Sequence, residues 1–163
     1  MKKNITTIGS IRVNGSVTFT DPGRSPGDRT YHELEDFLPG LYTCSMWTEM
    51  LSGVETVLEV TVRHSSRKRT PMHERAPFLV GIDSGQACIS DASCYRRAHG
   101  TEQKAERFFW RAARRLDRRT TGIIGSSAVV CRSGLGDGTY EVYLSRNATG
   151  VIVAAQIRFH RPW

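Results

Sequence analysis

Two aspartates that lie among glycines are the residues whose surroundings most suggest chemistry. Asp83 precedes Ser84 and Gly85, and Asp137 lies in a run with three alternate glycines. If the fold brings the two segments together, their carboxylates could act as acid and base or hold a metal ion. No nucleophile elbow and no Ser/His/Asp or Cys/His set accompanies them. The enzymatic hypothesis, a small hydrolase, therefore depends on these aspartates alone.

The first segment, residues 81–86 with the sequence GIDSGQ, allows two interpretations. An aspartate followed by Ser-Gly forms an Asx turn, and this structural role accounts for every residue except Gln86. Alternatively, Asp83, Ser84 and Gln86 are polar groups at the rim of a pocket, with Asp91 nearby. Both interpretations stay open at the level of sequence.

The second segment, residues 133–140 with the sequence SGLGDGTY, can turn several backbone N–H groups toward one point. That geometry is typical of an anion-binding nest. No long helix follows, so the phosphate loop and the dinucleotide motif do not apply. A glycine-rich bulge at the mouth of a barrel is the alternative. Gly136, Asp137 and Tyr140 are the predicted ligand contacts of this segment.

Positive charge is concentrated in two places, and the formal net charge is +7. The predicted basic surface consists of Arg67, Lys68, Arg69, Arg111, Arg114, Arg115 and Arg118. A field of this sign attracts nucleic acid, acidic proteins or small anions. A solvated basic face without a partner is the alternative.

The hydrophobic pattern predicts mostly β structure around these segments. Residues 8–13 and 17–20 flank Asn14-Gly15, a dipeptide typical of a tight hairpin. Residues 101–119 carry one apolar stripe at helical spacing, with Thr101 as the N-cap. Further strands are predicted at residues 40–47, 54–64, 78–82, 86–90, 128–133, 139–145 and 151–160. We expect a mostly β (α+β) fold in a single domain over residues 1–163. It would be a curved antiparallel sheet, a partly open barrel or a sandwich, with one amphipathic helix packed on it.

Composition sets the cellular expectations. No apolar run approaches the ~20 residues needed to cross a bilayer, and the first residues lack the apolar stretch of a secretory signal. A cytoplasmic protein is therefore predicted. The cysteines at positions 44, 88, 94 and 131 lack the close spacing of a zinc site, so we expect buried thiols and neither metal nor cofactor.

Three short sequence motifs are spread along most of the chain. Thr20-Asp21-Pro22 ends an early strand, GIDSGQACISD spans residues 81–91 with Tyr95 after it, and a glycine-rich box with a hairpin pattern occupies residues 130–159. In this combination the chain resembles a family of small uncharacterised proteins of bacteria and their phages. Leu135 stands where that family usually has an aromatic residue. The resemblance implies a shared fold and no known reaction.

The leading hypothesis is a non-catalytic binding module for a small anionic ligand such as a nucleotide. A phage-type accessory or anti-defence protein that sequesters such a ligand is the more specific version. The alternatives are binding of nucleic acid or an acidic protein through the basic loop and helix, and the hydrolase with paired aspartates. A non-catalytic role is favoured over an enzymatic one, and the sequence makes no prediction about the oligomeric state.

Overall fold

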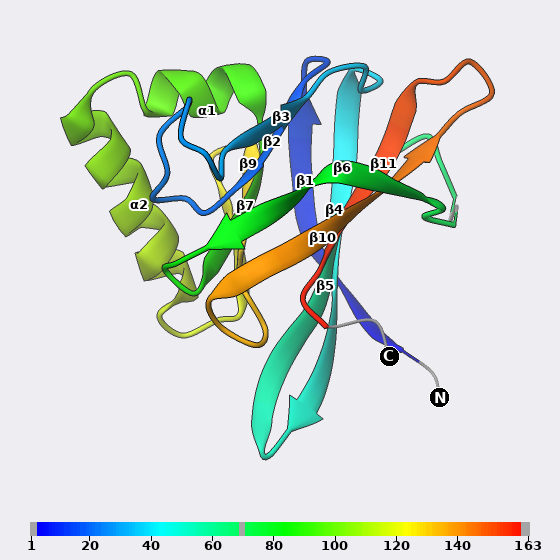
Figure 1. Cartoon of the computed structure of the whole chain (residues 1–163). Coiled ribbons are helices and arrows are strands. Elements are labelled where there is room, and N and C mark those ends of the chain that lie inside the picture. The colour runs from blue at the N-terminus through cyan, green and yellow to red at the C-terminus, as the bar shows by residue number, and fades with distance from the viewer. Residues whose placement is uncertain (1–2, 69–70, 161–163) are drawn as a thin grey trace.

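The computed structural model describes residues 3–68 and 71–160, which form two antiparallel β-sheets with two helices beside them (Figure 1). The elements in chain order are β1 (Asn4–Val13), β2 (Val17–Thr20), β3 (His32–Leu34), β4 (Gly40–Leu51), β5 (Val54–His64), β6 (Glu74–Ile82), β7 (Gln86–Asp91), α1 (Ala92–Ala98), α2 (Glu102–Leu116), β8 (Thr121–Ile124), β9 (Ala128–Arg132), β10 (Gly138–Arg146) and β11 (Ile152–Arg158). The predicted mostly β fold is confirmed, and the two sheets do not close into a barrel.

The large sheet has the strand order β1-β4-β5-β11-β10-β6, and the small sheet has the order β3-β2-β7-β9-β8. The main core lies between them, because its buried side chains come from both sheets: Ile11 and Val60 belong to the large sheet, and Phe19 and Ile89 to the small sheet. Alternate residues of each strand point to opposite faces. The structure is therefore a sandwich.

The helix predicted at residues 101–119 is α2. Its N-cap is Thr101, whose hydroxyl accepts a hydrogen bond from the Lys104 N–H at 3.2 Å. Phe108, Ala112 and Leu116 recur at helical spacing and are buried against the outer face of the small sheet. Full burial of a side chain such as Phe108 stabilises the fold by about 2 kcal/mol. The sequence did not predict the second helix, α1, which packs on the same side.

The hairpin predicted at Asn14-Gly15 is wrong. The preceding strand, β1, pairs with β4 in the large sheet, whereas the following strand, β2, pairs with β3 and β7 in the small sheet. Residues 83–85 likewise connect a strand of the large sheet, β6, to a strand of the small sheet, β7. A turn dipeptide between two apolar stretches predicts a reversal of the chain, but it does not say whether the strands continue as partners. The predicted hairpin of β10 and β11 is confirmed by their antiparallel pairing.

Candidate functional site

The two glycine-flanked aspartate segments meet in space. The Gly85 N–H donates a hydrogen bond to Oδ1 of Asp137 at 2.8 Å, although the two residues lie 52 positions apart. Gly85 has a φ of +68°, a conformation that a side chain would strain. We call the assembly of Asp21, residues 83–85 and Asp137 the aspartate corner.

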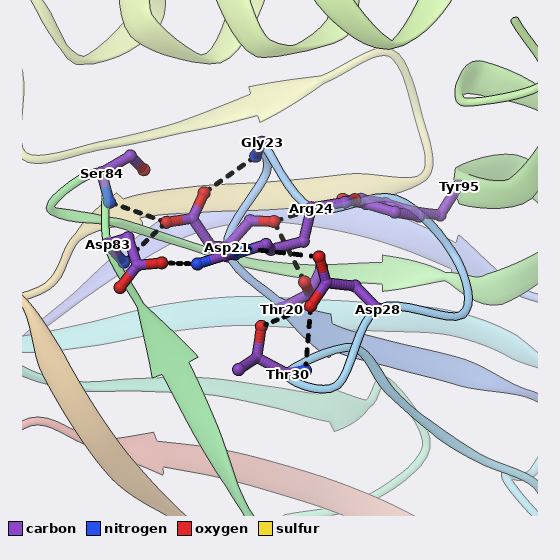
Figure 2. A network of polar contacts seen from close by, with 9 residues as sticks. All are labelled: Thr20, Asp21, Gly23, Arg24, Asp28, Thr30, Asp83, Ser84 and Tyr95. Carbon is purple, nitrogen blue, oxygen red and sulfur yellow. Dashed lines mark hydrogen bonds and ion pairs between the residues drawn. The ribbon is translucent and has the colours of Figure 1, made fainter. Parts of the chain in front are cut away.

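A buried carboxylate that the sequence did not single out as a site residue organises this corner. Asp21 is 2% exposed, and its Oδ2 accepts hydrogen bonds from the Asp83 N–H at 2.9 Å and the Ser84 N–H at 2.8 Å. Its Oδ1 accepts a third from the Gly23 N–H at 2.8 Å (Figure 2). The backbone donors that could have bound an external anion are therefore bound to the protein's own carboxylate. The Asp21-Pro22 turn was the signal available in the sequence.

The Asp83 side chain points away from this backbone and pairs with Arg24. Arg24 also contacts Asp28, with Nη1 and Oδ2 3.4 Å apart. The Thr30 N–H donates to Asp28, and this hydrogen bond together with Arg24 lowers the pKa of that carboxyl. Two carboxylates, those of Asp83 and Asp28, thus pair with a single guanidinium in this network, which makes the surroundings unfavourable for another anion.

Tyr95 supports the corner from α1. Its hydroxyl donates to the Arg24 carbonyl at 2.6 Å and lies 3.2 Å from the Asp21 carbonyl. The ring is fully buried, and burial raises the pKa of the Tyr95 hydroxyl. Because the hydroxyl stays protonated, it remains a donor at neutral pH. Residues 21–24 are therefore held from two sides.

The second glycine segment closes largely on itself. The hydroxyls of Ser133 and Tyr140 both donate to the Gly136 carbonyl, at 2.7 and 2.6 Å. Gly134 lies so close to the Val57 carbonyl that a Cβ would come within 2.1 Å of its oxygen. These contacts form a packed turn in which the Gly136 carbonyl oxygen is the hydrogen-bond acceptor. Asp137 and Tyr140 also line a cavity of about 450 Å³ with Glu141, Arg158 and His160.

Asp91 lies apart from the corner and caps α1. Its buried carboxylate accepts hydrogen bonds from the Cys94 N–H at 3.0 Å, the Ser93 hydroxyl at 2.7 Å and the Asn14 N–H at 2.8 Å. Burial alone would raise the pKa of Asp91, but these hydrogen bonds outweigh it and lower the pKa. All its contacts among the described residues serve the fold.

Ser84 and Gln86 complete the predicted ligand contacts. Ser84 is exposed, and its N–H is bound to Asp21. Gln86 is half-buried, and its Oε1 has no donor among the described residues. Neither residue lines one of the cavities described here, so a ligand contact at either remains a prediction.

The predicted basic surface divides into two separate parts. Arg67 and Lys68 are exposed in the connection from β5 to β6, and Arg69 lies outside the described residues. Arg111, Arg114, Arg115 and Arg118 are exposed on α2 or directly after it. Figure 1 shows α2 at the left of the molecule and the β5–β6 connection at the right. The two parts do not form one continuous patch.

Two of the predicted α2 arginines line a cavity of about 730 Å³, together with a third that was not among the predicted site residues. These are Arg115, Arg118 and Arg119, and we call the cavity the arginine groove. Four threonine residues add hydroxyls, and the rest of the lining is mostly apolar. The further lining residues are Thr6, Thr7, Ile8, Met46, Glu55, Thr120, Thr121, Gly122 and Ile123.

The groove lies where the edges of the two sheets meet. β1 is the outermost strand of the large sheet, and β8 is the outermost strand of the small sheet. They approach closely at Gly9, where a Cβ would lie 3.2 Å from Cγ1 of Ile123. Gly122 likewise allows α2 to pack closely on β8, because a Cβ at this position would lie 3.0 Å from Cβ of Arg115. Small residues thus bring the arginine directly over β8.

The electrostatics of the groove differ from those of the corner. No ion pair joins Arg115, Arg118 or Arg119 to another residue within the described ranges. The one carboxylate in the lining, Glu55, accepts a hydrogen bond from the Thr48 hydroxyl at 3.2 Å. Three guanidinium groups are therefore available to an incoming anion.

Neither the buried cysteines nor a metal-binding cluster provides a further candidate site among the described residues. Cys44, Cys88 and Cys131 are buried free thiols, and burial raises the pKa of the Cys44 thiol to about 12. Residues 3–68 and 71–160 contain no group of three or more His, Cys, Asp or Glu side chains arranged to hold a metal ion. Within the same residues, no helix is long and apolar enough to cross a membrane.

Comparison with known proteins identifies one relationship. Residues 54–157 match the model of a family described as a protein of unknown function, DUF4241. The match extends from β5 to β11 and includes residues 83–85, Asp137 and the three arginines of the groove. No curated protein and no solved structure matches the chain.

Proposed function

The chain belongs to the DUF4241 family, and we propose that it is a non-catalytic module that binds a small anionic ligand in the arginine groove. The observation that carries this proposal is the set of three arginines without an ionic partner in the described chain, gathered at the edges of two sheets. Like charges this close repel one another, so an anion between them would be stabilised.

The chemistry of the lining fits phosphate in particular. A guanidinium presents a planar set of donors that matches phosphate oxygens bidentately, and threonine hydroxyls can add further donors. Ile8, Met46 and Ile123 offer an apolar surface for the rest of a ligand. The volume of about 730 Å³ lies within the range of small-molecule and cofactor sites. A nucleotide combines the required phosphate with a flat, partly apolar base.

The aspartate corner is less suited than the arginine groove to bind an anion. Its backbone donors are bound to Asp21 and Asp137, and its charged side chains are all carboxylates. The two parts of the basic surface lie at opposite ends of the view in Figure 1, which favours a small ligand over a long nucleic acid. Sequestration of a signalling nucleotide, as a phage-type accessory protein would perform it, needs only this binding step.

Calorimetry with ATP, ADP and pyrophosphate, and with adenosine as the uncharged control, tests the proposal. We expect micromolar binding of at least one phosphorylated compound and none of adenosine. A double variant with Arg115→Glu and Arg118→Glu should abolish the signal. The matched control exchanges Arg111 and Arg114 for Glu, because both lie on α2 but neither lines the groove.

Two outcomes would contradict the proposal. One is the absence of heat with every phosphorylated compound up to high micromolar concentrations. The other is an equal loss of binding in the control variant, which would assign the effect to the general charge of α2. Binding of single-stranded oligonucleotides without any binding of mononucleotides would instead favour the nucleic-acid alternative.

A further inference from the structure

The outer face of the large sheet buries polar side chains in the absence of a covering helix. Glu59 is 5% exposed, Thr61 7% and Gln156 8%, and their strand neighbours Val60 and Ile157 belong to the core on the other side of the sheet. Both helices pack on the small sheet (Figure 1). Burying a carboxylate costs free energy unless it is paired, so the burial of Glu59 has to be explained by its partners.

Glu59 lies at the centre of a dense network. Its carboxylate accepts hydrogen bonds from Lys3 Nζ at 3.2 and 3.4 Å and from Gln156 Nε2 at 3.2 Å. His160 Nε2 lies 3.1 Å from Oε1 of Glu59, and Arg158 Nε lies 3.9 Å from the same oxygen. With these partners around it, Glu59 acts as a positioning residue for the surrounding cations.

Arg158 is fixed from two further directions. Its Nε donates to Oε1 of Gln156 at 2.7 Å, and its guanidinium lies 3.7 Å from the centre of the Tyr143 ring. Neither contact uses the two Nη groups, which form the end of the guanidinium that binds carboxylates bidentately. The arginine is therefore held in one orientation before a ligand arrives.

A cavity of about 370 Å³ opens over this network. Its charged lining residues are Lys3, Arg63, Arg158 and Glu59, so cations outnumber the single carboxylate. The apolar lining residues are Ile5, Met46, Trp47, Pro71 and Met72. We call this cavity the sheet-face pocket. A cationic part beside an apolar part is the environment that an organic acid requires.

Trp47 provides an independent observation. Its Nε1 is buried and has no acceptor among the described residues, whereas a buried indole N–H normally has one. Lys3 lies over the same ring, with Nζ 4.1 Å from its centre. The pocket thus combines cations with a donor that lacks an acceptor, and both are complementary to an oxygen anion.

We propose that the sheet-face pocket binds a small organic carboxylate with an apolar or aromatic body, at a site that shares Met46 with the arginine groove but has cations of its own. The carboxylate contacts Lys3 and the Nη groups of Arg158, and a small shift of the indole lets Trp47 Nε1 donate to one of its oxygens. The body packs on the Trp47 ring and Met72. Glu59 holds the cations in place.

Calorimetry with phenylacetate, phenylacetamide and phenethylamine tests the proposal, because the three share one body and differ in charge. We expect saturable binding of phenylacetate and at least about tenfold weaker binding of the other two, since a hydrogen bond to a charged group is the stronger kind. Trp47→Phe should weaken the binding of phenylacetate about tenfold, because it removes the N–H and retains the ring.

Two control variants define the site. Trp110→Phe alters an exposed indole on α2, outside the sheet-face pocket, and should leave the binding of phenylacetate unchanged. The Arg115/Arg118 double variant should also leave it unchanged, so this inference and the proposed groove ligand can fail separately. The melting temperature of Trp47→Phe shows whether it is folded.

Three results would overturn the inference. They are equal binding of phenethylamine and phenylacetate, undiminished binding of phenylacetate by folded Trp47→Phe, and no saturable heat with phenylacetate up to millimolar concentrations. In the last two cases, a rise in the melting temperature of Trp47→Phe would show that its N–H is only an unsatisfied donor.

Discussion

The aspartate corner gathers like charges from distant parts of the chain, whereas the arginine groove takes its three arginines from residues 115–119, and the two regions differ in how those charges are used. In the corner, Asp21 accepts three backbone N–H hydrogen bonds, and Asp83 is paired with Arg24. In the groove, Arg115, Arg118 and Arg119 have no ionic partner among the described residues. The comparison shows that the conspicuous glycine and aspartate boxes hold the sandwich together. The charges that remain available to a ligand are those of the groove arginines, at and just after the C-terminal end of α2, where no sequence motif draws attention to them.

The difference should appear first as a difference in stability. Asp21→Asn is expected to lower the free energy of unfolding by about 3 kcal/mol, because the amide that replaces this buried carboxylate cannot provide both oxygens as acceptors for three backbone N–H groups. Urea denaturation measures the change. Asp28→Asn, in the same network but less buried, should change the stability much less. A loss at Asp21 below about 1 kcal/mol would remove the structural interpretation of the corner.

Tyr95→Phe tests the same region from the side of α1. Removal of the hydroxyl leaves the Arg24 carbonyl without its 2.6 Å hydrogen bond and should cost about 1.5 kcal/mol. Chemical denaturation measures the loss, and the double variant with Asp21→Asn should lose less than the sum, because both act on residues 21–24. Strict additivity would mean that the two contacts are independent.

Acid should distinguish carboxylate-based parts of the fold from the groove, and Asp91 is the clearest case. Its folded pKa lies below its ordinary value of 3.8, so its contribution to stability is present above about pH 4 and is lost as the pH falls through the folded pKa. Melting temperatures between pH 5 and pH 2.5 should therefore fall less steeply for Asp91→Asn than for the wild type. Parallel curves would contradict this assignment.

The smallest effect on stability is expected in the groove. Arg118→Gln should change the free energy of unfolding by less than about 0.5 kcal/mol, since the side chain is exposed and forms no ion pair with a described residue. The same variant should weaken pyrophosphate binding, and raised salt should weaken it further. A destabilisation comparable to that of Asp21→Asn would show that the groove is structural as well.

Local patterns in the sequence identified much of the fold. The spacing of Phe108, Ala112 and Leu116 predicted α2, and apolar alternation predicted β5, β10 and β11. The short α1 was missed because seven residues contain less than two full turns of a recognisable period. β3 and β8 were missed because three or four residues are too few for an alternation to stand out.

The sequence by itself determined what depends on near neighbours along the chain: the helical stripe, the alternating strands, and the turn chemistry of residues 83–85 and 133–140. Only the tertiary structure decided that Asn14-Gly15 joins two sheets and that Asp21 accepts the N–H groups of Asp83 and Ser84. It also decided that Gly9 of β1 meets Ile123 of β8 where the edges of the two sheets approach each other. The physical reason is that these contacts join residues far apart in sequence, and no local preference of the backbone encodes which distant partner a charge or a strand edge will meet.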